Sequence, residues 1–361
     1  MTDPQSPTPD PRPPIKVLIV EDSRVMQELL AHIINSDPML RVVSIAGNGE
    51  EAIDAVNKFC PDVITMDICM PKMDGITATR RIMETHAIPI VIVSGNNQAT
   101  EVACSFQLLE AGAVAVLLRP PGIGHPDYKR AAGELIQTLK LMSEVKVVTR
   151  TQRVTKERII SPPSSVPYIP KSTSTAEIIA IGASTGGPHI LKKIISGLPK
   201  NLPVPLLIVQ HIARGFVEGF VEWLSSTCNF PLHIAAHDEY PLPGHGYVAP
   251  DDFHMGVGSD GQIVLSNHAP ENGLKPSVAY LFRTTAQVFG SRAVGVLLTG
   301  MGRDGADELK LMKEKGAVTF AQDKESSVVH GMPGAAIKLN AATHILSPEN
   351  ITAALTALTK R

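Results

Sequence analysis

Short runs of β-branched and apolar residues alternate with stretches that carry apolar residues at helical spacing, and this alternation constrains the fold more than any other feature. A chain of this kind forms a parallel sheet with helices on both faces. We therefore predict a five-stranded parallel sheet and five helices over residues 15–143. The strand-like runs are 15–20, 41–46, 62–67, 88–95 and 113–118, and the helix-like stretches include 24–34, 49–59, 76–86 and 127–142.

A segment rich in proline, serine, threonine and basic residues, 149–175, interrupts the alternation and predicts a linker without a core of its own. We place the linker at 144–176. A second alternating pattern over 177–358 predicts a doubly wound, mainly parallel α/β domain, in which the short runs of 232–267 indicate a small antiparallel excursion. The clearest strands are 177–182, 204–211 and 292–300, and the clearest helices are 186–198 and 305–316.

Composition narrows the class of protein. The formal net charge of −2 gives no electrostatic reason to expect nucleic acid or an anionic membrane as the main partner. No apolar run approaches the roughly 20 residues that span a bilayer, and the proline-rich residues 1–14 lack the apolar core of a secretory signal. We therefore expect a disordered tail and a cytoplasmic protein. Cys60, Cys69, Cys104 and Cys228 form no CxxC pair, which favours free thiols over disulfides or a zinc site.

Charged and hydroxyl side chains follow the predicted strands of the first half. The carboxyl ends of parallel strands lie at one edge of a sheet, so these side chains should meet there. Clustered carboxylates repel one another unless a hard cation such as Mg²⁺ joins them, and a carboxylate beside Mg²⁺ can attack a phosphoryl group. One acidic residue at a strand end usually caps a helix, but five suitable residues favour phosphoryl transfer. They are Glu21, Asp22, Asp67, Ser94 and Arg119.

The motifs VEDS, TMDICMPKMDG, VIVSG and LLRPP resemble a response-regulator receiver domain over nearly all of residues 15–142. The resemblance implies a flavodoxin-like fold and phosphorylation of Asp67 by a histidine kinase, with Ser94 and Arg119 as switch residues. The family has lysine in place of Arg119, and because a guanidinium is larger and planar, slow phosphorylation or weak signal transmission is expected. The implied Mg²⁺ ligands are Glu21, Asp22, Asp67 and the backbone carbonyl of Cys69.

A tight glycine-rich turn in the second half, GASTG at 182–186, satisfies G-x-S-x-G between an apolar strand and a helix that Pro188 could start. Glycines permit backbone angles that other residues avoid, and N–H groups at the helix N-terminus can support an oxyanion. The turn could instead serve only packing or phosphate binding. The short pattern does not decide between these interpretations and a nucleophile at Ser184.

A nucleophilic serine needs a base, and the base needs an orienting group. Among the 12 histidines, His211 closes an apolar strand and precedes a helix-like stretch, and Asp304 lies just past another buried strand. Asp251 and Asp252 are competing orienters, but they follow a core strand less directly. A single strand-end histidine is usually structural, whereas the joint placement of Ser184, His211 and Asp304 beyond core strands favours catalysis.

The order serine, histidine, aspartate differs from that of the α/β-hydrolases. The motifs IGASTGGP, VQH, LPGHGYVAPDDFHM, LLTGMGRDGA and ESSVVHGMPGAA instead resemble the catalytic domain of the chemotaxis protein-glutamate methylesterases over residues 178–358. The family usually has arginine and aspartate at the positions of Lys275 and Ala279, so altered substrate recognition is expected. The resemblance implies Ser184 as nucleophile, His211 as general base, Asp304 as orienter, Thr185 as an auxiliary residue and the Met301 N–H as an oxyanion donor.

By the same resemblance, the protein hydrolyses γ-methyl esters of glutamate on the cytoplasmic helices of methylated chemoreceptors, deamidates certain glutamines and needs no cofactor for the ester reaction. The receiver would cover the catalytic cleft until Asp67 is phosphorylated. Two alternatives remain open: a phosphorylation-gated binding module with a catalytically weak esterase-like domain, and a serine hydrolase of small esters. A DNA-binding response regulator is disfavoured because the chain has neither a basic output domain nor a helix-turn-helix signature.

Overall fold

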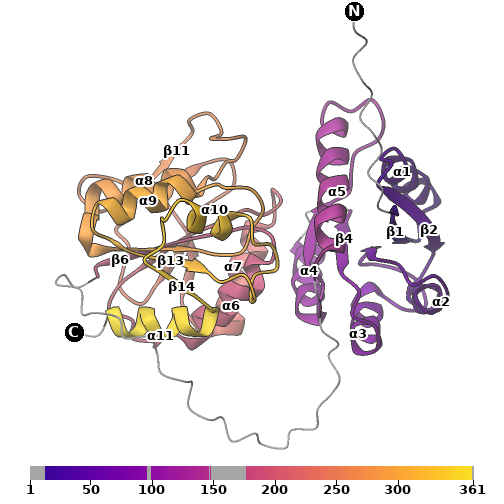
Figure 1. The fold of residues 1–361 in the computed structure, drawn as a ribbon, viewed down its shortest axis with the longest axis horizontal. Helices are drawn as coiled ribbons and strands as arrows, with labels where there is room; N and C mark the ends of the chain where they lie inside the picture. Colours follow the sequence, from indigo (N-terminus) through magenta and orange to yellow (C-terminus); the bar gives the residue numbers. More distant parts are fainter. Residues whose placement is uncertain (1–12, 96–98, 146, 148–175, 360–361) are drawn as a thin grey trace, which may run out of the picture. The chain divides into compact units, whose positions relative to one another are not determined.

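The structure is a computed structural model that describes residues 13–95, 99–145, 147 and 176–359 (Figure 1). These residues build a five-stranded sheet and a seven-stranded sheet, each with its own helices, and a separate two-stranded sheet. The predicted tail at 1–14 falls almost entirely outside the described residues, as does most of the predicted linker at 144–176. The proposed domain boundaries therefore remain predictions.

The first sheet has the strand order β2-β1-β3-β4-β5, and β1 pairs in parallel with both β2 and β3. Every residue of β3 and β4 is buried, as expected for strands covered on both faces. The predicted five-stranded receiver fold is confirmed, with strand ends within two residues of those predicted. Its strands are β1 (Ile15–Val20), β2 (Leu40–Ala46), β3 (Val63–Met66), β4 (Ile90–Ser94) and β5 (Ala115–Leu118), and its helices are α1 (Arg24–Asn35), α2 (Gly49–Phe59), α3 (Gly75–Thr85), α4 (Ala99–Ala111) and α5 (Tyr128–Ser143).

The second sheet has the order β14-β13-β12-β6-β7-β9-β8, with parallel pairing throughout. The antiparallel excursion is confirmed as the pair β10 (His254–Val257) and β11 (Ile263–Ser266). The earlier part of that region instead supplies β8 and β9, which extend the main sheet. The strands of the sheet are β6 (Ile178–Ala183), β7 (Leu206–Gln210), β8 (Leu232–Ile234), β9 (Gly246–Val248), β12 (Ala293–Leu297), β13 (Val318–Gln322) and β14 (His344–Leu346).

Helices cover both faces of the second sheet, as predicted for a doubly wound domain. One layer holds α8, α9 and α10, and the other holds α6, α7 and α11 (Figure 1). No helix among the described residues has the length and apolar character that a bilayer crossing requires. The helices are α6 (Gly187–Gly197), α7 (Val217–Cys228), α8 (Val278–Phe289), α9 (Ala306–Glu314), α10 (Met332–Lys338) and α11 (Pro348–Leu358), with a short 3₁₀ turn at Gly290–Arg292.

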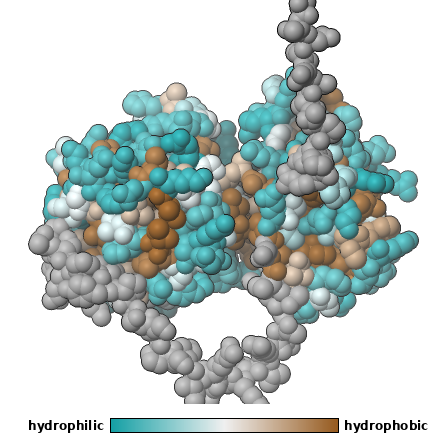
Figure 2. All heavy atoms as spheres, in the orientation of Figure 1, coloured by the Kyte–Doolittle hydropathy of each residue, from teal (hydrophilic) through white to brown (hydrophobic). Residues whose placement is uncertain are grey.

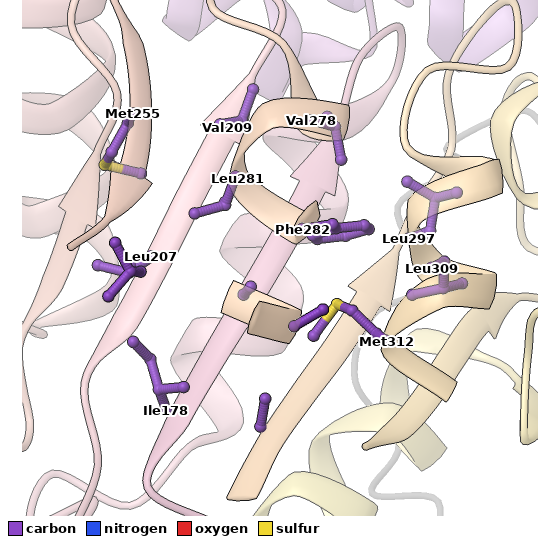
Figure 3. Close-up of a cluster of buried hydrophobic side chains, with 14 of the residues drawn as sticks. Ile178, Leu207, Val209, Met255, Val278, Leu281, Phe282, Leu297, Leu309 and Met312 are labelled. Carbon is purple, nitrogen blue, oxygen red and sulfur yellow. The ribbon is translucent and has the colours of Figure 1, made fainter. Parts of the chain in front are cut away.

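The core of the second sheet lies between β6, β7 and β12 and the helices α8 and α9 (Figure 3). Val278 belongs both to this core and to the first turn of α8. A Cβ atom added at Gly182 in β6 would lie 2.3 Å from the Cγ1 atom of Val278, so the start of α8 packs directly on the end of β6. Apolar packing thus sets the position of the α8 N-terminus. On the face shown in Figure 2, the surface around each of the two large sheets and its helices is mainly hydrophilic.

Candidate active site and acidic cluster

Strand pairing places Ser184 beside His211. Each residue directly follows the end of its strand, and β6 pairs with β7 so that Ala183 lies opposite Gln210. The His211 N–H donates to the Ala183 carbonyl at 2.9 Å. On the other side, the Ser184 N–H donates to the carbonyl of Thr299, just past β12, at 3.0 Å. The candidate nucleophile is therefore held between the ends of two neighbouring strands.

Glycines allow the backbone to close tightly around Ser184. Gly186 has a φ of +76°, in the left-handed region that favours glycine, and a Cβ there would lie 2.6 Å from the Cβ of Val328. A Cβ on Gly300 would lie 2.6 Å from the Cβ of Ser184. The turn thus serves close packing and also places a serine at the rim of the sheet, so the two interpretations of its glycines are compatible.

Asp304 receives its hydrogen bonds from the N-terminus of α8. Its Oδ1 accepts from the Ser277 hydroxyl at 2.9 Å and the Ala279 N–H at 3.1 Å, and its Oδ2 accepts from the Val278 N–H at 2.7 Å. The first N–H groups of a helix have no partner within the helix and favour negative charge. The carboxylate is therefore fixed in place by three donors.

The imidazole of His211 contacts this carboxylate. Its Nε2 lies 3.0 Å from Oδ2 of Asp304, which is within ion-pair distance. Burial raises the pKa of Asp304, but the contact with His211 and its charge, together with the donors of α8, outweigh burial and hold that pKa below its usual range. Asp304 is therefore ionised at neutral pH.

The two competing orienters contact other groups. Asp251 accepts a hydrogen bond from the Gly215 N–H at 2.6 Å, and Asp252 pairs with Arg214 at 2.6 Å. Burial raises the pKa of Asp251. Of the three candidate carboxylates, Asp304 is the one that the structure brings to the His211 ring.

The remaining predicted residues flank Ser184. The carbonyl of Thr185 accepts from the Thr299 hydroxyl at 3.0 Å. Met301 follows Gly300, and its N–H has no acceptor among the residues that the structure describes. Within those residues, no hydrogen bond joins the Ser184 hydroxyl to the His211 ring. Catalytic contacts of free enzymes are often loose and tighten when substrate binds.

The acidic residues of the first sheet also meet. Glu21, Asp22 and Asp67 each place a carboxylate oxygen within 4.8 Å of the others, with Glu21 and Asp67 buried and Asp22 exposed. The Nη2 atom of Arg119 lies 3.0 Å from Oε2 of Glu21 and 2.8 Å from Oδ1 of Asp67. Ser94 is fully buried at the end of β4. The three carboxylates and Arg119 thus lie together in the structure, whereas the convergence of Ser94 on them stays a prediction.

Burial and mutual repulsion act on the two buried carboxyl groups. Burial and the nearby Asp67 raise the pKa of Glu21 to about 7, against the lowering effect of Arg119. Burial also raises the pKa of Asp67, again opposed by Arg119. Burial, the largest cause of both shifts, disfavours the ionised carboxylates, and positive charge added there would favour them.

Comparison with known proteins identifies the families of both halves of the chain. Residues 179–355 match the family described as CheB methylesterase, and residues 17–124 match the response regulator receiver domain. A protein-glutamate methylesterase/protein-glutamine glutaminase of Nitrosospira multiformis is 58% identical over 346 residues, which covers 95% of this chain and 97% of that protein. This chain belongs to the CheB methylesterase family.

Two further relatives carry the same description. One from Geobacter metallireducens is 53% identical over 348 residues, covering 95% of this chain and 99% of that protein. One from Syntrophus aciditrophicus is 54% identical over 344 residues, covering 95% of this chain and 98% of that protein. The predicted combination of a receiver with a CheB methylesterase domain is confirmed.

The acidic cluster of this CheB family member fits Mg²⁺. Mg²⁺ prefers a few carboxylate oxygens and keeps several waters, and the cluster offers three carboxylates, two of them buried with raised pKa values. Glu21, Asp22 and Asp67 would hold the ion. The Cys69 side chain is exposed, and the assignment of its backbone carbonyl as a ligand stays a prediction.

Sequence reasoning missed three polar residues of the CheB site. Ser277 donates to Asp304, Thr299 accepts from the Ser184 N–H through its carbonyl, and Gln210 donates to the backbone of both Ser184 and His211. All three are buried. The sequence signal for Gln210 and Thr299 was a polar residue at the end of an apolar strand. The hydrogen-bond partners of such a residue depend on strand register, which the sequence does not give. Ala279 itself donates its N–H to Asp304, and Lys275 lies two residues before Ser277.

Proposed function

We propose that this CheB family member hydrolyses γ-methyl esters of glutamate on chemoreceptor helices and deamidates certain glutamines. The observation that carries the proposal is the contact of His211 Nε2 with the buried Asp304, beside a serine fixed by strand pairing. The curated relatives, whose names give both activities, support it. In this proposal Ser184 is the nucleophile, His211 the general base and Asp304 its orienter.

In this proposal, the contact with Asp304 determines the role of each nitrogen of the His211 imidazole. Because Nε2 faces a carboxylate that is ionised, Nε2 carries the proton, and Nδ1 is left as the base for the Ser184 hydroxyl. Ser184 Oγ then bonds to the ester carbonyl carbon while its proton passes to Nδ1. Asp304 stabilises the imidazolium that forms.

The resulting oxyanion needs donors that are already in place. The N–H of Met301, next to the glycine that packs on Ser184, is the proposed donor, and Thr185 is the auxiliary residue. Collapse breaks the bond to the methoxy oxygen, which takes the proton from His211 and leaves as methanol. A water molecule then attacks the glutamyl ester of Ser184 and gives a proton to His211. The bond between the acyl carbon and Ser184 Oγ breaks, Oγ takes that proton back, and glutamate is released. With a glutamine substrate, ammonia leaves instead.

We further propose that a histidine kinase phosphorylates Asp67. Bound Mg²⁺ would supply positive charge for the transferred phosphoryl group, while Ser94 and Arg119 would bind its oxygens. Because Arg119 contacts both Glu21 and Asp67 in this structure, its side chain must move for those oxygens to enter. The receiver would restrain the catalytic domain until phosphorylation, in a cytoplasmic protein with no nucleic-acid partner.

A methanol-release assay on methylated receptor tests the proposal. The full chain should release methanol, and acetyl phosphate should increase the rate. Ser184→Ala should abolish release, whereas Ser196→Ala, which removes an exposed hydroxyl at the end of α6, should not. Release of methanol by Ser184→Ala at the wild-type rate would contradict the assignment. Binding of receptor without release would instead favour the phosphorylation-gated binding module.

A further inference from the structure

One side chain joins the backbones of the proposed nucleophile and base. The Nε2 atom of Gln210 donates to the Ser184 carbonyl at 2.9 Å and to the His211 carbonyl at 2.7 Å. Gln210 is the last residue of β7 and is 3% exposed. We infer that Gln210 is a positioning residue that sets the separation of Ser184 and His211, an inference that rests on the roles proposed for those two residues.

The two hydrogen bonds extend the pairing of β6 with β7 beyond its last backbone contact. That contact is the bond from the His211 N–H to the Ala183 carbonyl, and the backbone of both catalytic residues continues past it. The amide of Gln210 uses both of its hydrogens there, one for each carbonyl. Beyond the bond from the His211 N–H to the Ala183 carbonyl, this amide is the link between the carbonyls of Ser184 and His211 in the part of the chain that the structure describes.

Gly187 provides the space for this amide. A Cβ atom on Gly187 would lie 2.1 Å from Oε1 of Gln210. The φ of Gly187 is not in the left-handed region, in contrast to that of Gly186, so the requirement for glycine is steric rather than conformational. This requirement accounts for the glycine that follows the G-x-S-x-G motif, a position that the motif itself leaves open.

A purely structural role for Gln210 is the competing explanation, and Gln322 offers a matched control. Gln322 is also the last residue of a core strand, β13, and is fully buried. Its Oε1 accepts from the Thr299 N–H at 2.8 Å, and its Nε2 donates to the Ser326 carbonyl at 2.9 Å. It makes no hydrogen bond to Ser184 or His211. Replacement by methionine keeps a similar volume, and it removes two hydrogen bonds at Gln210 and three at Gln322.

The test compares Gln210→Met with Gln322→Met in the full chain, by methanol release with acetyl phosphate and by thermal unfolding. A misplacement of reacting groups by about 1 Å costs on the order of 100-fold in rate. We expect Gln210→Met to lower kcat at least tenfold, with KM within about twofold, while Gln322→Met lowers Tm similarly and leaves kcat within about threefold. Equal effects of the two variants on kcat would overturn the inference.

Gln210→Glu supplies a readout that a structural role would not produce. An ionised carboxylate cannot donate to either carbonyl, whereas the protonated acid can donate to one. The activity of this variant relative to the wild-type chain should therefore rise as pH falls. Gln322→Glu keeps its acceptor for the Thr299 N–H and should show a weaker dependence. A ratio independent of pH for Gln210→Glu would contradict the inference.

Gly187→Ala tests the same geometry with Gln210 still present. It should lower kcat as Gln210→Met does, and full activity would show that the amide does not need its observed position. Labelling of Ser184 by a fluorophosphonate probe tests the inference without receptor. Slower labelling in Gln210→Met supports it, and equal labelling overturns it. Wild-type labelling without methanol release would contradict only the proposed substrate, whereas no labelling would overturn the inference together with the proposed nucleophile.

Discussion

The imidazole of His211 faces the carboxylate of Asp304 through Nε2, at 3.0 Å, and that carboxylate also accepts two N–H groups at the start of α8. A helix N-terminus thus holds the group that orients the proposed base. Because α8 is packed on β6 through Val278 and Gly182, the core of the domain sets the position of Asp304. The chemistry at the rim of the sheet depends in this way on apolar packing beneath it.

Removal of this carboxylate should leave the serine present but poorly activated. We expect Asp304→Asn to lower kcat by about 10²–10⁴-fold, because the amide supplies no charge for the imidazolium and can favour the wrong tautomer. Methanol release from methylated receptor measures the effect. Asp252→Asn is the control, since Asp252 pairs with the exposed Arg214. Equal losses in the two variants would show that Asp304 does not orient the base.

The sequence was sufficient to predict the strands and the residues at their ends, because long apolar runs are distinctive and parallel strands finish at a common edge. It was insufficient for β8 and β9, since strands of three residues carry too little periodicity. The sequence also did not predict which groups donate hydrogen bonds to Asp304, because Ser277 and Ala279 contact it only through the packing of α8. The contacts of Gln210 could not be predicted for a similar reason, because the hydrogen-bond partners of a buried amide depend on strand register.

The buried Glu21 should make stability depend on pH. Burial and Asp67 raise its pKa from 4.5 to about 7, so the folded chain binds its proton more tightly than the unfolded chain does. The stabilising effect of the protonated form is fully present below about pH 4 and is lost as pH rises to about 7. Relative to the wild-type chain, Glu21→Gln should gain stability over that interval, up to about 3 kcal/mol.

Chemical denaturation at several pH values in EDTA measures this gain. Glu28→Gln on α1 serves as the control for a change of charge near the same sheet. Addition of Mg²⁺ should reduce the advantage of Glu21→Gln at neutral pH, because the wild-type carboxylate then binds the ion. A stability difference between Glu21→Gln and wild type that stays constant from pH 4 to pH 8 would contradict the raised pKa.

Arg119 should slow the phosphorylation of Asp67. Its Nη2 atom bridges Asp67 and Glu21, and a planar guanidinium bound to two carboxylates must be displaced before the phosphoryl group can enter. Arg119→Lys should therefore increase the rate of phosphorylation by acetyl phosphate several-fold and strengthen Mg²⁺ binding measured by calorimetry. Arg130→Lys, an exposed change on α5, should do neither. Slower phosphorylation in Arg119→Lys would show that the guanidinium assists the reaction.

Removal of the receiver should raise the basal esterase rate. The proposed catalytic residues all lie just past strands of the second sheet, which has its own core, so a chain without residues 1–145 retains every group of the proposed reaction. Coupling between two sites commonly changes an activity by about 5- to 150-fold, and we expect an increase in that range without acetyl phosphate. The gain should be absent in a truncated chain that also carries Ser184→Ala. Equal basal rates in the full and truncated chains would argue against restraint by the receiver and would leave phosphorylation of Asp67 to act by another route.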